Sequence, residues 1–181
     1  MADELAIRGG RALDEALRTL VPKIQRNIMK SALRAGANVI KNEAKANAPV
    51  GPTSGENARL YGGYAGALRD SVRTVVKVDK NGRIGASVKV GGKNKKGADV
   101  FYAHFVEFGT RPHLIKAKPG EALNIGGSLH QSVQHPGMRP QPFFRPAFDN
   151  KAPAALAAVA EQIRRRLTKE NINVPAPEAL E

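Results

Sequence analysis

The 181-residue sequence predicts an α+β domain in which a small antiparallel β-sheet carries a long N-terminal helix and a C-terminal helix on one face, joined by long loops. Three observations predict this class. Amphipathic helical patterns stand towards both ends, a hairpin pattern stands between them, and strand–helix–strand alternation does not occur. The length fits one domain. We place it at residues 22–169, after an N-terminal arm or short helix at 1–21 and before an acidic, extended arm at 170–181.

Apolar residues spaced three and four apart predict two long helices. The first covers residues 22–46 and ends before Pro49, because the residue that precedes a proline avoids the helical conformation. The second is expected over residues 150–169, with Asn150 as its N-cap and Pro153 tolerated in its first turn. Residues 2–20 are expected to form a shorter helix.

The sheet is predicted from alternating apolar residues. They occur over 72–78 and 84–90, on either side of Asp79-Lys80-Asn81-Gly82, which is typical of a β-hairpin. Residues 100–102 are expected to add a third strand. The Gly-, Ser- and Asn-rich stretch 51–66 and the stretch 111–142, which has prolines, glycines and little periodicity, are expected to be long loops.

The chain is strongly basic, with 29 Lys and Arg against 16 Asp and Glu and a formal net charge of +13. Such an excess attracts polyanions or acidic protein surfaces. Lys93, Lys95 and Lys96, in a loop with glycines on both sides, are candidate DNA-facing residues, although a solvated loop tip has the same composition. Arginines 164–166 have the same two interpretations, since cations in a last helical turn also complement the helix dipole. The acidic arm suits contact with the basic surface of a neighbouring copy.

Several classes of function are disfavoured by composition. The absence of cysteine removes disulfides, thiolate metal sites and cysteine nucleophiles. Neither a membrane-spanning run nor an N-terminal signal sequence is apparent, so we expect a cytosol-like compartment. His104 and Glu107 are spaced for an acid–base pair or metal site, but no metal-ligand motif surrounds them. We favour a structural role in which Glu107 fixes the turn before Gly109 and Thr110 by meeting backbone donors or an arginine, and expect no enzyme activity, cofactor or metal.

Residues 135–148 concentrate four prolines and three phenylalanines. Prolines lower the entropy of an extended segment, so its aromatic side chains dock at little ordering cost. We expect Phe144 and Phe148 to fill the core beneath the last helix and Phe143 to face a neighbour.

Four motifs then occur in order: Ala48-Pro49, Gly66-Ala67-Leu68-Arg69-Asp70-Ser71-Val72, the segment 102–110 (YAHFVEFGT) and the segment 139–148 (RPQPFFRPAF). Together they resemble the tail-component family of long-tailed bacteriophages, named for the tenth gene product of a lambda-like coliphage. The resemblance spans roughly residues 24–167. It implies a structural protein of the virion neck that completes the tail, or joins it to the head connector, as a ring subunit.

The resemblance also sets expectations for sites and partners. Structural motif residues are Tyr102, Glu107, Gly109 and Thr110, and interface residues are Arg139, Phe143, Phe144 and Arg145. Expected partners are copies of the chain in a ring, other neck and tail proteins, and DNA in the channel without sequence preference, with no membrane. The expected location is the virion, and the host cytoplasm during assembly. Two alternatives stay open: a free-standing basic protein that binds nucleic acid non-specifically, and a small His/Glu hydrolase.

Overall fold

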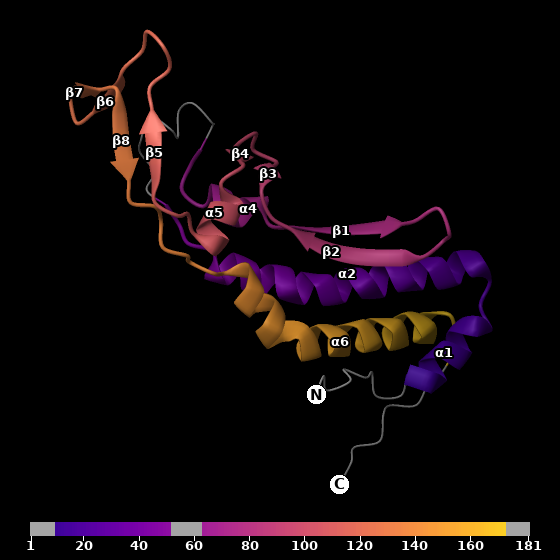
Figure 1. Ribbon diagram of the computed structural model, residues 1–181. Helices are drawn as coiled ribbons and strands as arrows, with labels where there is room; N and C mark the ends of the chain where they lie inside the picture. The colour runs from indigo at the N-terminus through magenta and orange to yellow at the C-terminus, as the bar shows by residue number, and fades with distance from the viewer. Residues whose placement is uncertain (1–9, 52–62, 173–181) are drawn as a thin grey trace.

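The computed structural model describes residues 10–51 and 63–172 and confirms the α+β class. Two long helices, α2 (Pro22–Asn47) and α6 (Phe144–Lys169), pack against each other, and a hairpin of β1 (Arg73–Val78) and β2 (Ile84–Lys89) lies on the other side of α2. The molecule therefore has three layers here, with α2 in the middle (Figure 1). Both helices lie on one side of the hairpin, as predicted.

The contact between α2 and α6 is made by small and aliphatic residues. With α1 (Gly10–Arg18), the two helices enclose one apolar cluster, which is built from Leu13, Leu17, Ile28, Ala32, Val159, Ala160, Ile163 and Leu167. Gly36 permits the close approach, because a Cβ there would lie 2.6 Å from Cγ2 of Val159. Of the helix expected over 2–20, residues 2–9 fall outside the described residues, and residues 19–20 follow the end of α1 in a turn.

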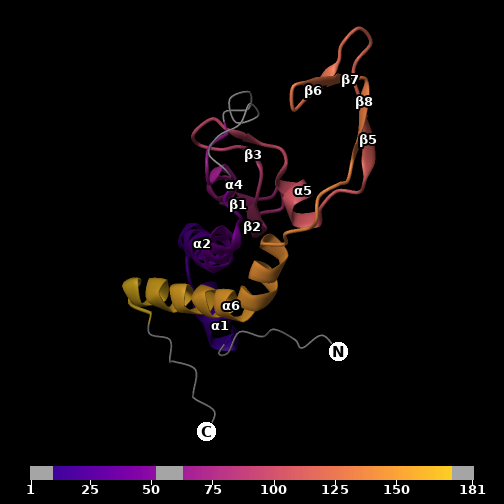
Figure 2. The ribbon, with the colours of Figure 1, turned by 90° about the vertical axis from the view of Figure 1, so that its left-hand side faces the viewer.

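Helix α6 begins at Phe144, six positions before the predicted Asn150 cap, so the predicted start is wrong. Pro146 is accommodated because it stands in the first turn, where an N–H has no partner within the helix. Pro153 stands inside the helix and interrupts its hydrogen-bond ladder. The axis of α6 bends in its first half (Figure 2), as an internal proline causes.

The predicted hairpin is confirmed. Its strands pair antiparallel from Arg73 opposite Lys89 to Val78 opposite Ile84. Asp79 closes the turn, since its Oδ1 accepts hydrogen bonds from the backbone N–H groups of Asn81 at 2.9 Å and Arg83 at 2.8 Å.

The third strand is only partly as predicted. Strand β4 (Asp99–Val100) pairs with β3 (Gly92–Lys93) in a separate two-residue ladder. The chain then turns at residues 101–102 into the short helix α5 (Ala103–Phe108), which lies beside α4 (Ala67–Ser71) (Figure 1).

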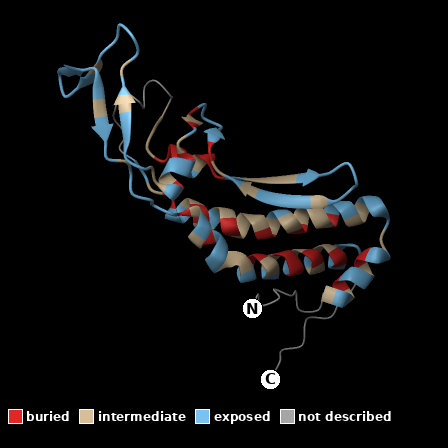
Figure 3. Ribbon diagram, in the orientation of Figure 1, coloured by how far each residue is buried: buried red, intermediate tan, exposed pale blue. Residues whose placement is uncertain are grey.

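The expected loop at 111–142 is instead largely a projecting β-arm, so this prediction is wrong. Strand β5 (His113–Lys116) pairs with β8 (Ser132–His135), and β6 (Leu123–Ile125) pairs with β7 (Ser128–His130) at the far end. The arm extends away from the helices (Figure 2) and is mostly exposed (Figure 3). The Gly126-Gly127 pair was a hairpin signal that its short, mixed strands obscured.

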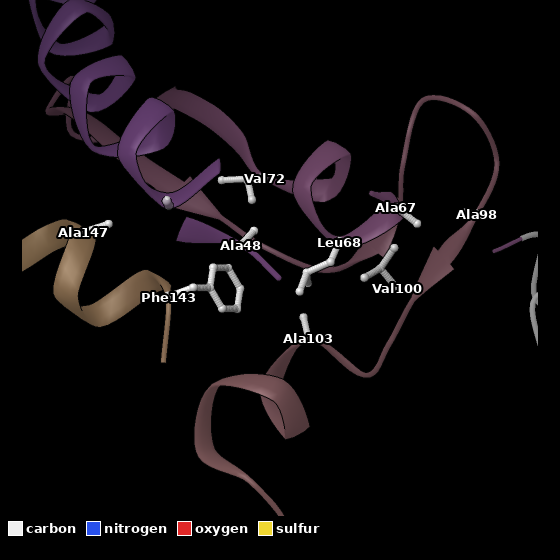
Figure 4. Close-up of a cluster of buried hydrophobic side chains, with 10 residues drawn as sticks. Ala48, Ala67, Leu68, Val72, Ala98, Val100, Ala103, Phe143 and Ala147 are labelled. Atoms are coloured by element: carbon white, nitrogen blue, oxygen red, sulfur yellow. The ribbon is translucent and has the colours of Figure 1, made fainter. Parts of the chain in front are cut away.

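A second apolar cluster joins the helices to α4 and α5, and Phe143 is its largest side chain at 1% exposed. Its ring points from the start of α6 towards Leu68 and Ala48 (Figure 4). Phe148, by contrast, is 52% exposed. The expectation that Phe143 faces a neighbour while Phe148 fills the core is therefore reversed, because the earlier helix start changes which side chains point inward.

Candidate nucleic-acid interface

A basic groove of about 490 Å³ lies where α2, α4, the start of β1 and the β3–β4 turn meet. The predicted residues Lys93, Lys95 and Lys96 line one wall. Four further basic residues also line the groove, and sequence analysis did not assign them to this site. They are Arg34, Lys41, Lys45 and Arg73. Among the described residues, the fold thus gathers seven cationic side chains around one acidic side chain, Asp70.

The wall formed by α2 is a stripe of three cations. Arg34, Lys41 and Lys45 are separated by seven and four residues, which places them on one face of a helix. At 1.5 Å per residue the stripe is about 16 Å long. This spacing is visible in the sequence, but only the packing of the hairpin against α2 shows that the stripe meets the lysines of the β3–β4 turn.

Asp70 anchors the turn to α4. Its Oδ2 accepts a hydrogen bond from the Tyr64 hydroxyl at 2.7 Å and pairs with Nζ of Lys96 at 3.0 Å. The same ammonium lies 4.6 Å from the centroid of the Tyr64 ring, and Nδ2 of Asn94 donates to the Tyr64 hydroxyl at 2.9 Å. Asp70 and the Tyr64 ring therefore hold the Lys96 side chain in place.

This network shifts the ionisation of its members. The hydrogen bond from Tyr64, and then Lys96, lower the pKa of the Asp70 carboxyl. The pKa of Tyr64 is raised, first by desolvation and then by its hydrogen bond to Asp70. The hydrogen bond with Asp70 raises the pKa of Lys96. Asp70 is thus charged, and Tyr64 and Lys96 protonated, near neutral pH.

Arg73 is braced by backbone carbonyls. Its Nη1 donates to the carbonyl oxygens of Gly91 at 2.6 Å and Ser71 at 3.2 Å. The buried Oγ of Ser71 accepts from the Gly91 N–H at 3.1 Å. These bonds join α4, β1 and the approach to β3 into one frame that positions a guanidinium at the groove without neutralising it.

Glu107 occupies a second organised position, at the start of α6. Its Oε2 accepts hydrogen bonds from the backbone N–H groups of Phe143 at 2.9 Å and Phe144 at 3.0 Å, and its Oε1 accepts from that of Arg145 at 2.9 Å. Burial acts to raise the pKa of Glu107, but the three backbone donors together outweigh it and lower the pKa. The carboxylate thereby caps a helix that starts 37 residues later.

The rest of the 102–110 motif supports this junction. Gly109 has a φ of +71°, and a Cβ there would lie 2.5 Å from the Met138 carbonyl oxygen. Thr110 and Met138 form an antiparallel bridge, and the Gln141 N–H donates to the Val106 carbonyl at 2.8 Å. Tyr102 packs against the cluster around Phe143, and burial raises its pKa.

The arrangement does not favour the hydrolase alternative. Glu107 is committed to backbone donors, and the His104 ring lies against the Phe105 ring at a tilt of 46°, with centroids 3.9 Å apart. Across residues 10–51 and 63–172, no group of three or more His, Asp or Glu side chains is placed to hold a metal ion.

Aromatic side chains are exposed beside the junction. Phe101 is 49%, Phe105 38% and Phe108 73% exposed, although the chain has only six phenylalanines. Arg139 and Arg145, both expected at an interface, are also exposed. Grouped apolar exposure of this kind marks a protein-binding surface.

The described part of the chain is thus a small α+β fold that combines a cation-lined groove with a group of exposed aromatic side chains. The family described as "Bacteriophage HK97-gp10, putative tail-component" matches residues 11–109, which is more than half of the chain. The chain belongs to this family, and is therefore a bacteriophage tail component, a structural rather than catalytic part of the virion. The matched residues include the motifs at 48–49 and 66–72 and all of the motif at 102–110 except Thr110, whereas the motif at 139–148 lies beyond them.

Comparison with curated proteins and with solved structures finds no match. None of the helices within the described residues is long and apolar enough to cross a membrane.

Proposed function

We propose that this tail component is a ring-forming subunit of the phage neck or tail end, which joins the tail to the head connector and surrounds the DNA channel. The observation that carries the proposal is the exposure of Phe101, Phe105 and Phe108 around one short helix. In a symmetric ring, such a surface is covered by a different surface of the next subunit, a contact that closes when the rotation between subunits divides the circle.

The β-arm supports the same proposal. A two-stranded ladder is marginally stable by itself in water, and this one carries exposed apolar side chains, Leu114 at 50%, Ile125 at 44% and Leu129 at 74%. Packing against a neighbouring protein would stabilise the arm. We include other neck and tail proteins among its partners, with the virion as the location and the host cytoplasm as the site of assembly.

The interface residues are revised accordingly. Arg139, Phe144 and Arg145 stay in the proposed interface, whereas Phe143 supports it from the core. The acidic arm at 170–181 is also retained, except that Ile172 packs against the α2–α6 cluster and its N–H donates to the Leu167 carbonyl at 3.0 Å. Residues 173–181 of this arm lie outside the described residues.

Cryo-electron microscopy of purified particles tests the proposal. The expected result is a ring of density at the neck or tail end into which residues 10–51 and 63–172 fit, with α5 at the subunit boundary. Density elsewhere in the particle, or a single isolated copy, would contradict it. The alternative, a free-standing non-specific nucleic-acid-binding protein, is favoured by the groove alone and predicts no incorporation into particles.

A further inference from the structure

We infer that the groove between α2, β1 and the β3–β4 turn binds the phosphate backbone of double-stranded DNA, with Arg34, Lys41, Lys45 and Arg73 as contact residues beside Lys93 and Lys95. The inference rests on the proposed function, in that DNA passes close to the assembled subunit. The inference identifies duplex DNA as the partner of the groove. The groove includes residues of α2 and β1 in addition to the lysines of the β3–β4 turn.

The first argument is positive charge that is largely uncompensated within the described residues. Among the described residues, Asp70 is the one acid that lines the groove, and Lys96 already pairs with it. The remaining six cations form no ion pair within residues 10–51 and 63–172. They concentrate positive potential in a concave surface, where it attracts a polyanion more strongly than scattered surface charges would.

The second argument is shape. The α2 stripe is about 16 Å long, and each strand of a duplex carries one phosphate per 3.4 Å of its axis, so the stripe matches a run of several phosphates. Lys93, Lys95 and Arg73 line the same groove from the β3–β4 turn and from β1. Lys41 is oriented by Asn38, whose Oδ1 accepts from its Nζ at 3.0 Å and from the Thr74 hydroxyl at 3.0 Å.

The third argument is the chemistry that the groove lacks. In the part of the chain that the structure describes, one aromatic side chain lines the groove, Tyr64, and its ring is already engaged by Lys96. Single-stranded nucleic acid is usually bound by a series of aromatic stacking surfaces, and base reading needs side chains that enter a DNA groove. The arrangement therefore suits phosphate contact without sequence preference, which permits DNA to move past.

A salt titration tests this with the full chain and a labelled duplex of arbitrary sequence. The groove variant carries Lys41→Gln, Lys45→Gln and Lys93→Gln. The control variant loses the same charge at the far end of the β1–β2 hairpin and on the arm, through Lys77→Gln, Lys80→Gln and Lys116→Gln. Fluorescence anisotropy gives the slope of log affinity against log salt between about 50 and about 200 mM.

We expect the groove variant to lose about 3 from the magnitude of the slope, since each phosphate contact contributes about 0.9, and the control to lose far less. Equal losses would overturn the inference, because binding would then follow net charge alone. Melting curves confirm folding, and a second variant with only Lys93→Gln and Lys95→Gln, both exposed, serves if the first is unstable.

A peptide of residues 170–181 provides the competing outcome. If it displaces the duplex and its own binding is lost in the groove variant but kept in the control, the groove holds the acidic arm of another copy and the DNA assignment is wrong. Failure of the proposed function is separate, because a ring position in the particle is observed whether or not the purified chain binds DNA through this groove.

Discussion

The Glu107 carboxylate accepts a hydrogen bond from the backbone N–H of Phe143, 36 positions later in the chain, at 2.9 Å. The bond connects the last turn of α5 to Phe143, the residue that directly precedes α6. It places the Phe143 ring in the core. One carboxylate thereby sets where the C-terminal helix starts and which of its phenylalanines is buried.

Glu107→Gln should destabilise the protein. Glutamine keeps one acceptor oxygen but turns an amide N–H₂ towards three backbone donors, at a cost of about 1–3 kcal/mol. Urea unfolding measures the change, with Glu161→Gln, on an exposed position of α6, as the control. An unchanged midpoint for Glu107→Gln would show that water replaces the carboxylate without loss.

The same carboxylate should make stability depend on pH. The pKa of Glu107 is lower in the folded protein than its ordinary value of 4.5, so the unfolded chain binds the proton more readily. The stabilisation is fully present above 4.5 and is lost as the pH falls below it through the folded-state pKa. The difference in unfolding free energy between the parent and Glu107→Gln should therefore narrow as urea titrations are carried to lower pH. A constant difference would argue against an ionised cap.

Sequence patterns were sufficient for the elements whose signals are local. The α2 period, the β1–β2 alternation and the Asp79 turn predicted a helix and a hairpin. The start of α6 was not predictable in this way, because its cap comes from Glu107 and local patterns favoured Asn150. The β-arm was missed because its strands are three or four residues long and mostly polar, which leaves little periodicity.

Only part of the candidate groove was predictable, because only some of its residues are neighbours in the sequence. Lys93, Lys95 and Lys96 stand together in the chain and were assigned at once. Arg34, Lys41 and Lys45 lie more than forty residues earlier, and they join the lysines only through the packing of α2 under the hairpin. Asp70 holding Lys96 is a tertiary contact that composition cannot show.

Gly36→Ala should loosen the contact between α2 and α6. The new methyl group would lie 2.6 Å from Cγ2 of Val159 and 2.8 Å from the Ala155 carbonyl oxygen. Overpacking costs about 1–3 kcal/mol, whereas the better helix propensity of alanine returns about 1 kcal/mol, so the net effect is a loss. The control is Gly85→Ala, whose methyl group would meet nothing within 4 Å. Equal thermal stability of the two variants would show that the helices separate without penalty.

Asp70→Asn should strengthen DNA binding. Asparagine still accepts the Tyr64 hydrogen bond, but it removes the one acidic charge that lines the groove and frees the Lys96 ammonium. The salt slope should steepen by about 0.9 if Lys96 then contacts a phosphate.

The control is Asp79→Asn, which makes the same charge change at the distant hairpin turn and should leave the slope of the salt titration nearly unchanged. The stability cost of Asp70→Asn should be small, because the Lys96 side chain is 66% exposed and solvent screens the ion pair. Weaker DNA binding by Asp70→Asn would contradict this prediction. It would mean that Asp70 matters more for positioning Lys96 and Tyr64 than for neutralising the positive charge of the groove.

Phe108→Ser should weaken assembly while leaving the fold intact. The Phe108 side chain is 73% exposed at the end of α5, so its removal costs the isolated chain little. At a subunit boundary, the same substitution would remove a large buried apolar contact.

The matched control is Val21→Ser, at a 64% exposed position between α1 and α2, because it removes apolar surface at the other end of the molecule. Incorporation of each variant into particles, measured against the parent in a mixed assembly, and the mass of the purified chain in solution provide the readouts. We expect the Phe108 variant to be depleted from particles at an unchanged melting temperature and the Val21 variant to be incorporated normally. Equal incorporation of both would remove α5 from the proposed interface, and with it the observation on which the ring proposal depends.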